Sequence, residues 1–290
     1  MPRPPLATRA IRAAVRRTLP LLSLALAVLA AAVLARPAAA QPSDGTVTAI
    51  TAQEINAYAQ RLGLTPTQRV AIDPIHDAYK AEFDQLRAQL IDPFMVRQRE
   101  LNMGGPAVTR EAVEEMLEQQ TRINGRVAQL DNRFFDQMAP LLSGPQQAML
   151  PRVRLARERV RLQANQMMMA FGGAPADISG MFARARIRLT PEQLVRVDEL
   201  LIPYEQRLTR RLGEFSELTN GMMLKMVTMM EDAGLLGMTQ EEMMADPERM
   251  QAVMETVQQA FAEVGRESGE KASEIRELNL TTYRRLLEVL

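Results

Sequence analysis

The sequence repeats one short motif, which reads LTPTQ at residues 64–68 and LTPEQ at residues 189–193. At an offset of 125 residues, the positions that follow the two copies also correspond. The matching pairs are Val70 with Val195, Asp73 with Asp198, Ile75 with Leu200 and Tyr79 with Tyr204. An internal repeat of this kind indicates that two related structural units follow one another along the chain.

The motif begins a helix in each copy. Thr65 and Thr190 are placed as N-cap residues, whose side-chain oxygen accepts a hydrogen bond from a backbone N–H of the first turn. Gln68 and Gln193 stand three residues later, where the side chain can reach back to the cap residue and close a capping box. Residues 142–146 form a looser third copy. The motif positions are Leu64, Thr65, Gln68, Leu142, Ser143, Gln146, Leu189, Thr190 and Gln193.

The composition favours extended helices over a dense globular core. Tryptophan is absent, aromatic residues make up 4% of the chain, and there are 20 methionines. After each motif, apolar residues recur at spacings of three and four, which is typical of a helix with one buried face. Pro74, Pro93 and Pro203 interrupt these segments and are expected to bend them. The predicted fold class is all-α, with long antiparallel helical hairpins in two tandem, curved units.

Three segments are expected along the chain. Residues 1–40 combine a basic leader, an apolar run and small residues, which is the pattern of a cleaved secretory signal peptide. The first helical unit then covers residues 41–170 and the second covers residues 171–290. Placing Phe135 on Tyr283 aligns Leu142 with Leu290. With this alignment, the second unit lacks the distal copy of the motif. The second unit is also rich in methionine.

Removal of the signal peptide makes the chain acidic. Residues 1–40 contain six of the 35 basic residues and no acidic residue, which leaves 29 basic against 35 acidic residues and a net charge of −6. An acidic protein is a poor candidate for nucleic-acid binding, which depends on neutralising phosphates. Cleavage near Ala40 predicts a periplasmic protein with no stable membrane insertion. The alternative is an inner-membrane protein anchored through an uncleaved N-terminal segment.

At the motifs, the chain resembles the periplasmic LTxxQ family of Spy-like and CpxP-like proteins. The resemblance covers most of residues 50–290. It implies a small all-α subunit with two motifs that pairs into a curved cradle, and it implies ATP-independent binding of unfolded envelope proteins during envelope stress. Two units in one chain imply an intramolecular pseudo-dimer, and a homodimer is the alternative.

Two groups of side chains are candidates for binding such clients. The segment after residue 146 is rich in arginine, which indicates a solvated basic face able to steer acidic clients. Fourteen of the 20 methionines lie between Met167 and Met254, and methionine adapts to irregular apolar surfaces. The candidate client-binding residues are Met222, Met226, Met229, Met230, Arg152, Arg154, Arg157 and Arg161.

The methionines leave other functions open. They can fill a core, or Met222, Met226 and Met229, which share one helical face, can bind a soft metal such as Cu(I) or Ag(I). A structural or regulatory envelope protein with one dedicated partner is a third hypothesis. His76 is the single histidine, so a zinc site with three or four such ligands is not expected, and His76 is interpreted as a surface or satisfied residue. We expect no cofactor.

Enzymatic chemistry finds little support in the residue types. Cysteine is absent and histidine occurs once, so nucleophile and base pairs built from these residues are nearly excluded. No glycine-rich phosphate loop follows a strand pattern. The chain is therefore predicted not to be an enzyme.

If the motif is mainly a helix-starting device, removing one cap should weaken the fold but not the function. We expect Thr190→Ala to lower the free energy of unfolding by about 1 kcal/mol, because one N–H of the first turn loses its acceptor. Binding of unfolded proteins should be nearly unchanged below the melting range. Chemical denaturation and a client-binding assay measure the two effects. A stable variant without binding would instead make the motif a contact site.

Overall fold

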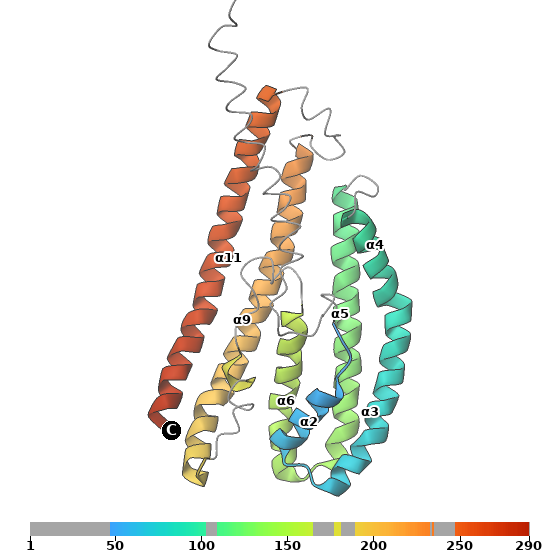
Figure 1. Ribbon diagram of the computed structural model, residues 1–290, viewed down its shortest axis with the longest axis vertical. Helices are drawn as coiled ribbons and strands as arrows, with labels where there is room; N and C mark the ends of the chain where they lie inside the picture. The colour runs from blue at the N-terminus through green and yellow to red at the C-terminus, as the bar shows by residue number, and fades with distance from the viewer. Residues whose placement is uncertain are drawn as a thin grey trace, which may run out of the picture.

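The computed structural model describes residues 47–102, 109–164, 177–180, 189–232, 234 and 247–289. Within these ranges the chain is helical and contains no strand, so the predicted all-α fold class is confirmed (Figure 1). None of the helices in these ranges is long and apolar enough to cross a membrane. The expected signal peptide at residues 1–40 lies outside the described residues, as does the stretch expected to separate the units at residues 171–175.

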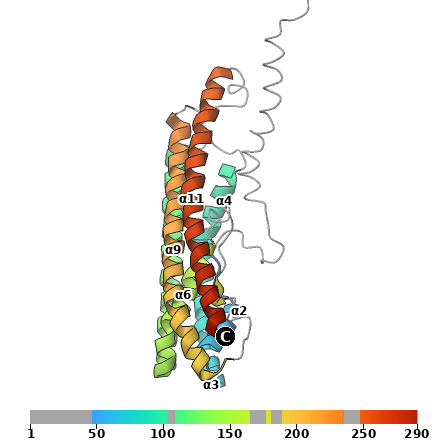
Figure 2. The same ribbon diagram turned by 90° about the vertical axis from the view of Figure 1, so that its left-hand side faces the viewer.

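The long helices stand side by side along one direction, and the short first helix runs obliquely to them (Figures 1 and 2). The first half of the described chain contains α2 (Ala52–Leu62), α3 (Pro66–Leu86), α4 (Asp92–Asn102), α5 (Arg110–Met138) and α6 (Gly144–Gln163). The second half contains two very long helices, α9 (Pro191–Asp232) and α11 (Pro247–Val289). These two helices run antiparallel, and α9 also packs on α6 and α5, so α9 joins the halves.

The helix starts follow the predicted capping pattern. The Thr65 hydroxyl accepts from Gln68 N–H at 3.2 Å, and Gln68 Oε1 accepts from Thr65 N–H at 2.9 Å. Thr190 and Gln193 make the same pair of bonds, at 3.2 and 3.0 Å. The first helix ends at Gly63, whose φ of 61° is the left-handed conformation that glycine adopts without strain. The motif is therefore a capping box in both copies.

The prolines lie within helices without ending them. Pro74 lies inside α3 and Pro203 lies inside α9, and both helices continue past them. Before Pro93, the chain forms a short π-helical turn, Arg87–Ile91, which leads directly into α4. A π-turn changes the hydrogen-bond register, so the chain can continue as a helix where proline lacks its N–H. In Figure 1, α3 and α4 together form one bowed column beside α5.

Each half has its own hydrophobic core. The first core is built from residues of α2 to α6 and includes Tyr79, Phe134 and Phe135. The second core is formed by α9 and α11 with Ile178, and includes Tyr204. Each core receives a partly buried side chain from the other half, Met223 and Leu162 respectively. The two cores are thus distinct but in contact.

Corresponding tyrosines make corresponding contacts in the two cores. The hydroxyl of Tyr79 accepts from Ile50 N–H at 3.1 Å and donates to Asp131 Oδ1 at 2.7 Å. The hydroxyl of Tyr204 accepts a backbone N–H at 2.9 Å, from Ile178, and donates to a side-chain oxygen of α11 at 2.9 Å. Burial raises the pKa of both tyrosines above the usual value, so both hydroxyls stay protonated and can donate.

The side-chain oxygen that accepts from Tyr204 belongs to Asn279, which stands 148 residues after Asp131. The same offset links a second pair of contacts, made by the motif glutamines. Gln68 Nε2 donates to the carbonyl of Leu141 at 2.8 Å, and Gln193 Nε2 donates to the carbonyl of Val289 at 3.4 Å. The α3–α5 and α9–α11 pairs therefore use the same contacts at matching positions.

The tyrosine contact can be tested in the second half. We expect Tyr204→Phe to lower the free energy of unfolding by about 1–3 kcal/mol, because the buried N–H of Ile178 loses its acceptor. The matched control is Tyr283→Phe, since Tyr283 is exposed and its hydroxyl can bind water. Urea denaturation of both variants measures the difference. An equal loss in both would contradict the role given to Tyr204.

Candidate functional site

The arginine-rich helix α6 lies between the two halves. It packs on α2 and α5 on one side and on α9 on the other. Arg152 and Arg159 are seven residues apart, which is about two helical turns, and both reach residues of the second half. Arg154, Arg157 and Arg161, at spacings of three and four, reach residues of α5. The arginines therefore divide between two faces of α6.

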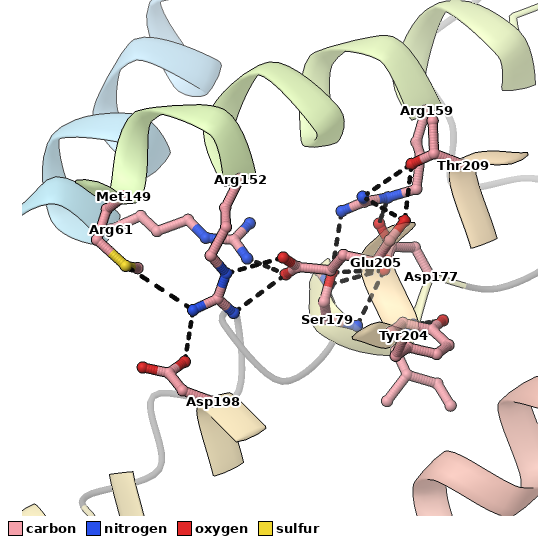
Figure 3. Close-up of polar contacts among 12 residues, drawn as sticks. Arg61, Met149, Arg152, Arg159, Asp177, Ser179, Asp198, Tyr204, Glu205 and Thr209 are labelled. Carbon is pink, nitrogen blue, oxygen red and sulfur yellow. Dashed lines mark hydrogen bonds and ion pairs between the residues drawn. The ribbon is translucent and has the colours of Figure 1, made fainter. Parts of the chain in front are cut away.

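On the α9 side, the guanidinium groups of Arg61 and Arg152 point toward one carboxylate, that of Glu205 (Figure 3). Glu205 is 0% exposed. Arg152 Nε donates to Glu205 Oε2 at 2.8 Å, and Arg61 of α2 donates to the other oxygen, Oε1. Arg152 also pairs with Asp198 through a contact of 2.5 Å between Nη1 and Oδ1. Three helices, α2, α6 and α9, thus meet at one carboxylate.

The second contact on this side is made by Arg159, which is also buried. Its Nε donates to Asp177 Oδ2 at 2.8 Å, and its Nη2 donates to the hydroxyl of Ser179 at 3.1 Å (Figure 3). Burial by itself raises the pKa of Asp177, but Arg159 and the hydrogen bonds from Ser179 and Gly180 outweigh it, so the pKa is held below the usual value. Asp177 is therefore ionised around neutral pH.

On the α5 side, the buried carboxylate is Asp131. Its Oδ2 accepts from Arg157 Nε and from Arg161 Nη1, each at 2.8 Å, while its Oδ1 accepts from the hydroxyl of Tyr79. Arg157 also donates to Glu54 Oε1 at 3.1 Å. Burial lowers the pKa of Arg157, but Asp131 and Glu54 raise it more, so this guanidinium remains charged inside the protein.

These contacts correct the interpretation of α6 as a solvated basic face. Arg152 and Arg157 are buried, so they are not on a surface where acidic clients could be steered. Arg154 and Arg161 are only partly exposed, and they pair with Asp136 and Asp131 respectively. The sequence did contain a signal for this arrangement, because Asp131 falls within the apolar periodicity of its helix. A carboxylate at such a position needs a cationic partner.

The methionine candidates divide between the core and the surface. Met222 is buried, whereas Met226, Met229 and Met230 are half-buried on α9. The expected histidine role is confirmed, because His76 is buried with its Nε2 at 2.8 Å from the Ile50 carbonyl, to which it donates. Across the described ranges, the His, Cys, Asp and Glu side chains form no group of three or more that could hold a metal ion.

The exposed apolar surface that sequence reasoning missed lies on α11. Its members are Leu280, Tyr283 and Leu287, and we call these three residues the α11 face. Their exposed fractions are 50%, 53% and 55%. Spacings of three and four place them on one side of the helix, so they form one continuous apolar surface. The α9–α11 contact leaves this surface uncovered.

In the first half, the position that corresponds to Tyr283 is buried beneath other helices. At the offset of 148, Phe135 corresponds to Tyr283, and Phe135 is only 1% exposed. The ring of Tyr58 from α2 lies 5.8 Å from the ring of Phe135, and the guanidinium of Arg154 from α6 lies 5.4 Å from it. The two halves therefore differ in whether helices cover this face.

Comparison of the chain with protein-family models, with curated proteins and with solved structures found no match. The candidate surfaces are therefore judged by their own geometry and chemistry. Among the described residues, the buried arginine contacts connect the two halves, and the α11 face is the candidate surface for binding.

The contact at Glu205 should be one of the most sensitive points of the fold. We expect Glu205→Ala to lower the free energy of unfolding by about 3–5 kcal/mol, because Arg61 and Arg152 lose the carboxylate that compensates for their burial. Glu217→Ala is the matched control, since Glu217 lies exposed on the same helix. Chemical denaturation measures both. A loss below about 1 kcal/mol, the size of a surface pair, would contradict the structural role.

Proposed function

We propose that this protein is an exported, ATP-independent chaperone-like protein that binds unfolded envelope proteins, as the resemblance to the LTxxQ family implies. The observation that carries the proposal is the α11 face, on which three large apolar side chains are each at least half-exposed. Unfolded chains expose apolar segments, and covering both surfaces releases about 25 cal/mol for each Å² of apolar area. Such binding needs no nucleotide.

The surroundings of the α11 face suit a reversible contact. The neighbouring exposed residues of α11 carry both signs of charge. They are Arg276, Glu277, Arg284, Arg285 and Glu288. An apolar patch with a charged rim is typical of a protein-binding surface, and the rim keeps the free protein soluble. The arginines of this rim, rather than those of α6, are the ones available to attract acidic clients.

The half-buried methionines extend the binding surface toward the other end of the hairpin. Lys225 of α9 pairs with Glu263 of α11 at 2.7 Å, so Met226 and Met229 lie on α9 near the level of Glu263, in the middle part of α11. The α11 face lies about 20 residues further along, which is roughly 30 Å of helix. Methionine is flexible and adapts to many partners. A client that contacted both groups would have to be extended over this length, and adaptable contacts of this kind suit a binder of many sequences.

The proposal is tested by adding the mature protein to several unrelated, chemically unfolded proteins and following their aggregation by light scattering. We expect the protein to slow aggregation, and we expect Tyr283→Ser with Leu287→Ser to lose most of that effect because the apolar face is removed. The matched control is Val70→Ser with Val96→Ser, which removes two exposed apolar side chains from the first half.

The thermal transition of each variant shows whether it is folded. If the α11 variant slowed aggregation as well as the control variant, the activity would not depend on the α11 face. If the unmodified protein protected none of the unfolded proteins, the chaperone proposal would be wrong.

A further inference from the structure

All of the sulfur in this chain is methionine thioether, because the sequence contains no cysteine. Five of the nine residues from 222 to 230 are methionines, and all five lie on α9. Met222 is buried, whereas Met223, Met226, Met229 and Met230 are half-buried. We call these four half-buried residues the α9 methionines. Their side chains are partly open to solvent, so a small oxidant can reach them.

Met223 differs from the other α9 methionines in what it packs on. Although it belongs to the second half, its side chain lies against the hydrophobic core of the first half. Met226, Met229 and Met230 are not among the side chains that pack on either core. Of the described residues of the second half, Met223 is thus the apolar side chain that reaches the first core.

The junction between the halves has two parts with different chemistry. Where α6 meets α9, charged side chains hold the halves together, as in the contact of 2.8 Å between Arg152 Nε and Glu205 Oε2. Met223 lies roughly 27 Å further along α9. Beyond the end of α6, the neighbour of α9 in the first half is α5 (Figure 1). The charge of Glu231 on α9 acts on Arg110 at the start of α5. Met223 therefore belongs to an apolar part of the junction, between α5 and α9.

We propose that the α9 methionines are a site of reversible oxidation by peroxide, and that oxidation of Met223 loosens the α5–α9 part of the junction. In this step one oxygen atom passes from hydrogen peroxide to the thioether sulfur, which forms a sulfoxide and releases water. The sulfur loses two electrons, and the peroxide gains them. A dithiol reverses the step, since it becomes a disulfide while the oxygen leaves as water.

The effect on the junction follows from the polarity of the sulfoxide. Its S–O group accepts hydrogen bonds, so it is stabilised by water and destabilised against the apolar side chains of the first core. The other α9 methionines can be oxidised without this effect, because they do not pack on a core. The contacts of Glu205 are made by arginine side chains, which peroxide does not attack. Oxidation should therefore open the junction at one end and leave the other end in place.

Peptide mass spectrometry after treatment with dilute hydrogen peroxide identifies the oxidised residues. We expect the α9 methionines to gain one oxygen atom at least about fivefold faster than the buried methionines. These are Met116, Met138 and Met222, which are 8%, 1% and 3% exposed. Fragment ions separate Met222 from Met223, and treatment in denaturant shows the rates without protection. If Met223 gained oxygen no faster than Met138 in the folded protein, the proposed site would be wrong.

Hydrogen exchange of backbone amides measures the loosening. We expect oxidation to raise the exchange rate in residues 110–125 of α5 and 214–232 of α9 about threefold or more. Residues 150–160 of α6 should be unchanged, because the charged part of the junction remains. Methionine sulfoxide reductase should restore the original rates.

Two substitutions at Met223 separate its role from general oxidative damage. Met223→Gln introduces a polar side chain of similar length and should raise exchange without peroxide. The matched control is Met229→Gln, because Met229 is half-buried on the same helix and packs on neither core. Met223→Leu keeps an apolar side chain without sulfur, so exchange in this variant should not respond to peroxide.

Two exchange results would overturn the inference. One is an equal response to peroxide in Met223→Leu and in the unmodified protein, since the loosening would then come from another residue. The other is equal exchange in Met223→Gln and Met229→Gln. Both measurements use the protein alone, so they do not depend on the proposed binding of unfolded proteins. A protein that fails to slow aggregation can still contain the oxidation site, and one that slows aggregation can lack it.

Discussion

The fold depends on a carboxylate that has no access to water. Glu205 lies between the halves, and its charge is compensated only because α2 and α6 bring Arg61 and Arg152 to it. An unpaired buried charge costs several kcal/mol, so these three helices must be in place together. Such contacts are directional, whereas apolar packing alone tolerates helices that slide or rotate. The network therefore determines how the second half sits against the first, and it accounts for the arginine content of α6.

The same logic explains the main difference between the halves. Asp131 can be charged because α6 supplies Arg157 and Arg161 to it. At the corresponding position of α11, the residue is Asn279, whose neutral side chain accepts the tyrosine hydrogen bond without bringing a charge into the core. Because α6 packs on α5, it also helps to cover Phe135, whereas Tyr283 at the matching position stays exposed. The apolar surface of α11 is thus a consequence of where α6 packs.

Local signals in the sequence were sufficient for most of the secondary structure. The caps at Thr65 and Thr190 depend on side chains three residues apart, so they could be predicted without knowledge of the fold. The role of the arginines could not be predicted in this way. A run such as Arg152 to Arg161 is exposed or buried according to which helices come to lie beside it, and residues about 50 positions away, such as Glu205, decide that. The interpretation as a solvated face was wrong for this reason.

The sequence by itself determined the all-α class, the positions of the helix starts and the correspondence between the two motif copies, because capping and helical periodicity act within a few residues. Only the tertiary structure decided which charged side chains are buried and which apolar side chains remain exposed. Exposure depends on the neighbours that a face acquires, and the repeated pattern gives Phe135 and Tyr283 equivalent places with opposite exposure. The LTxxQ stretches start the helices, but the packing of α6 decides which surface is free to bind.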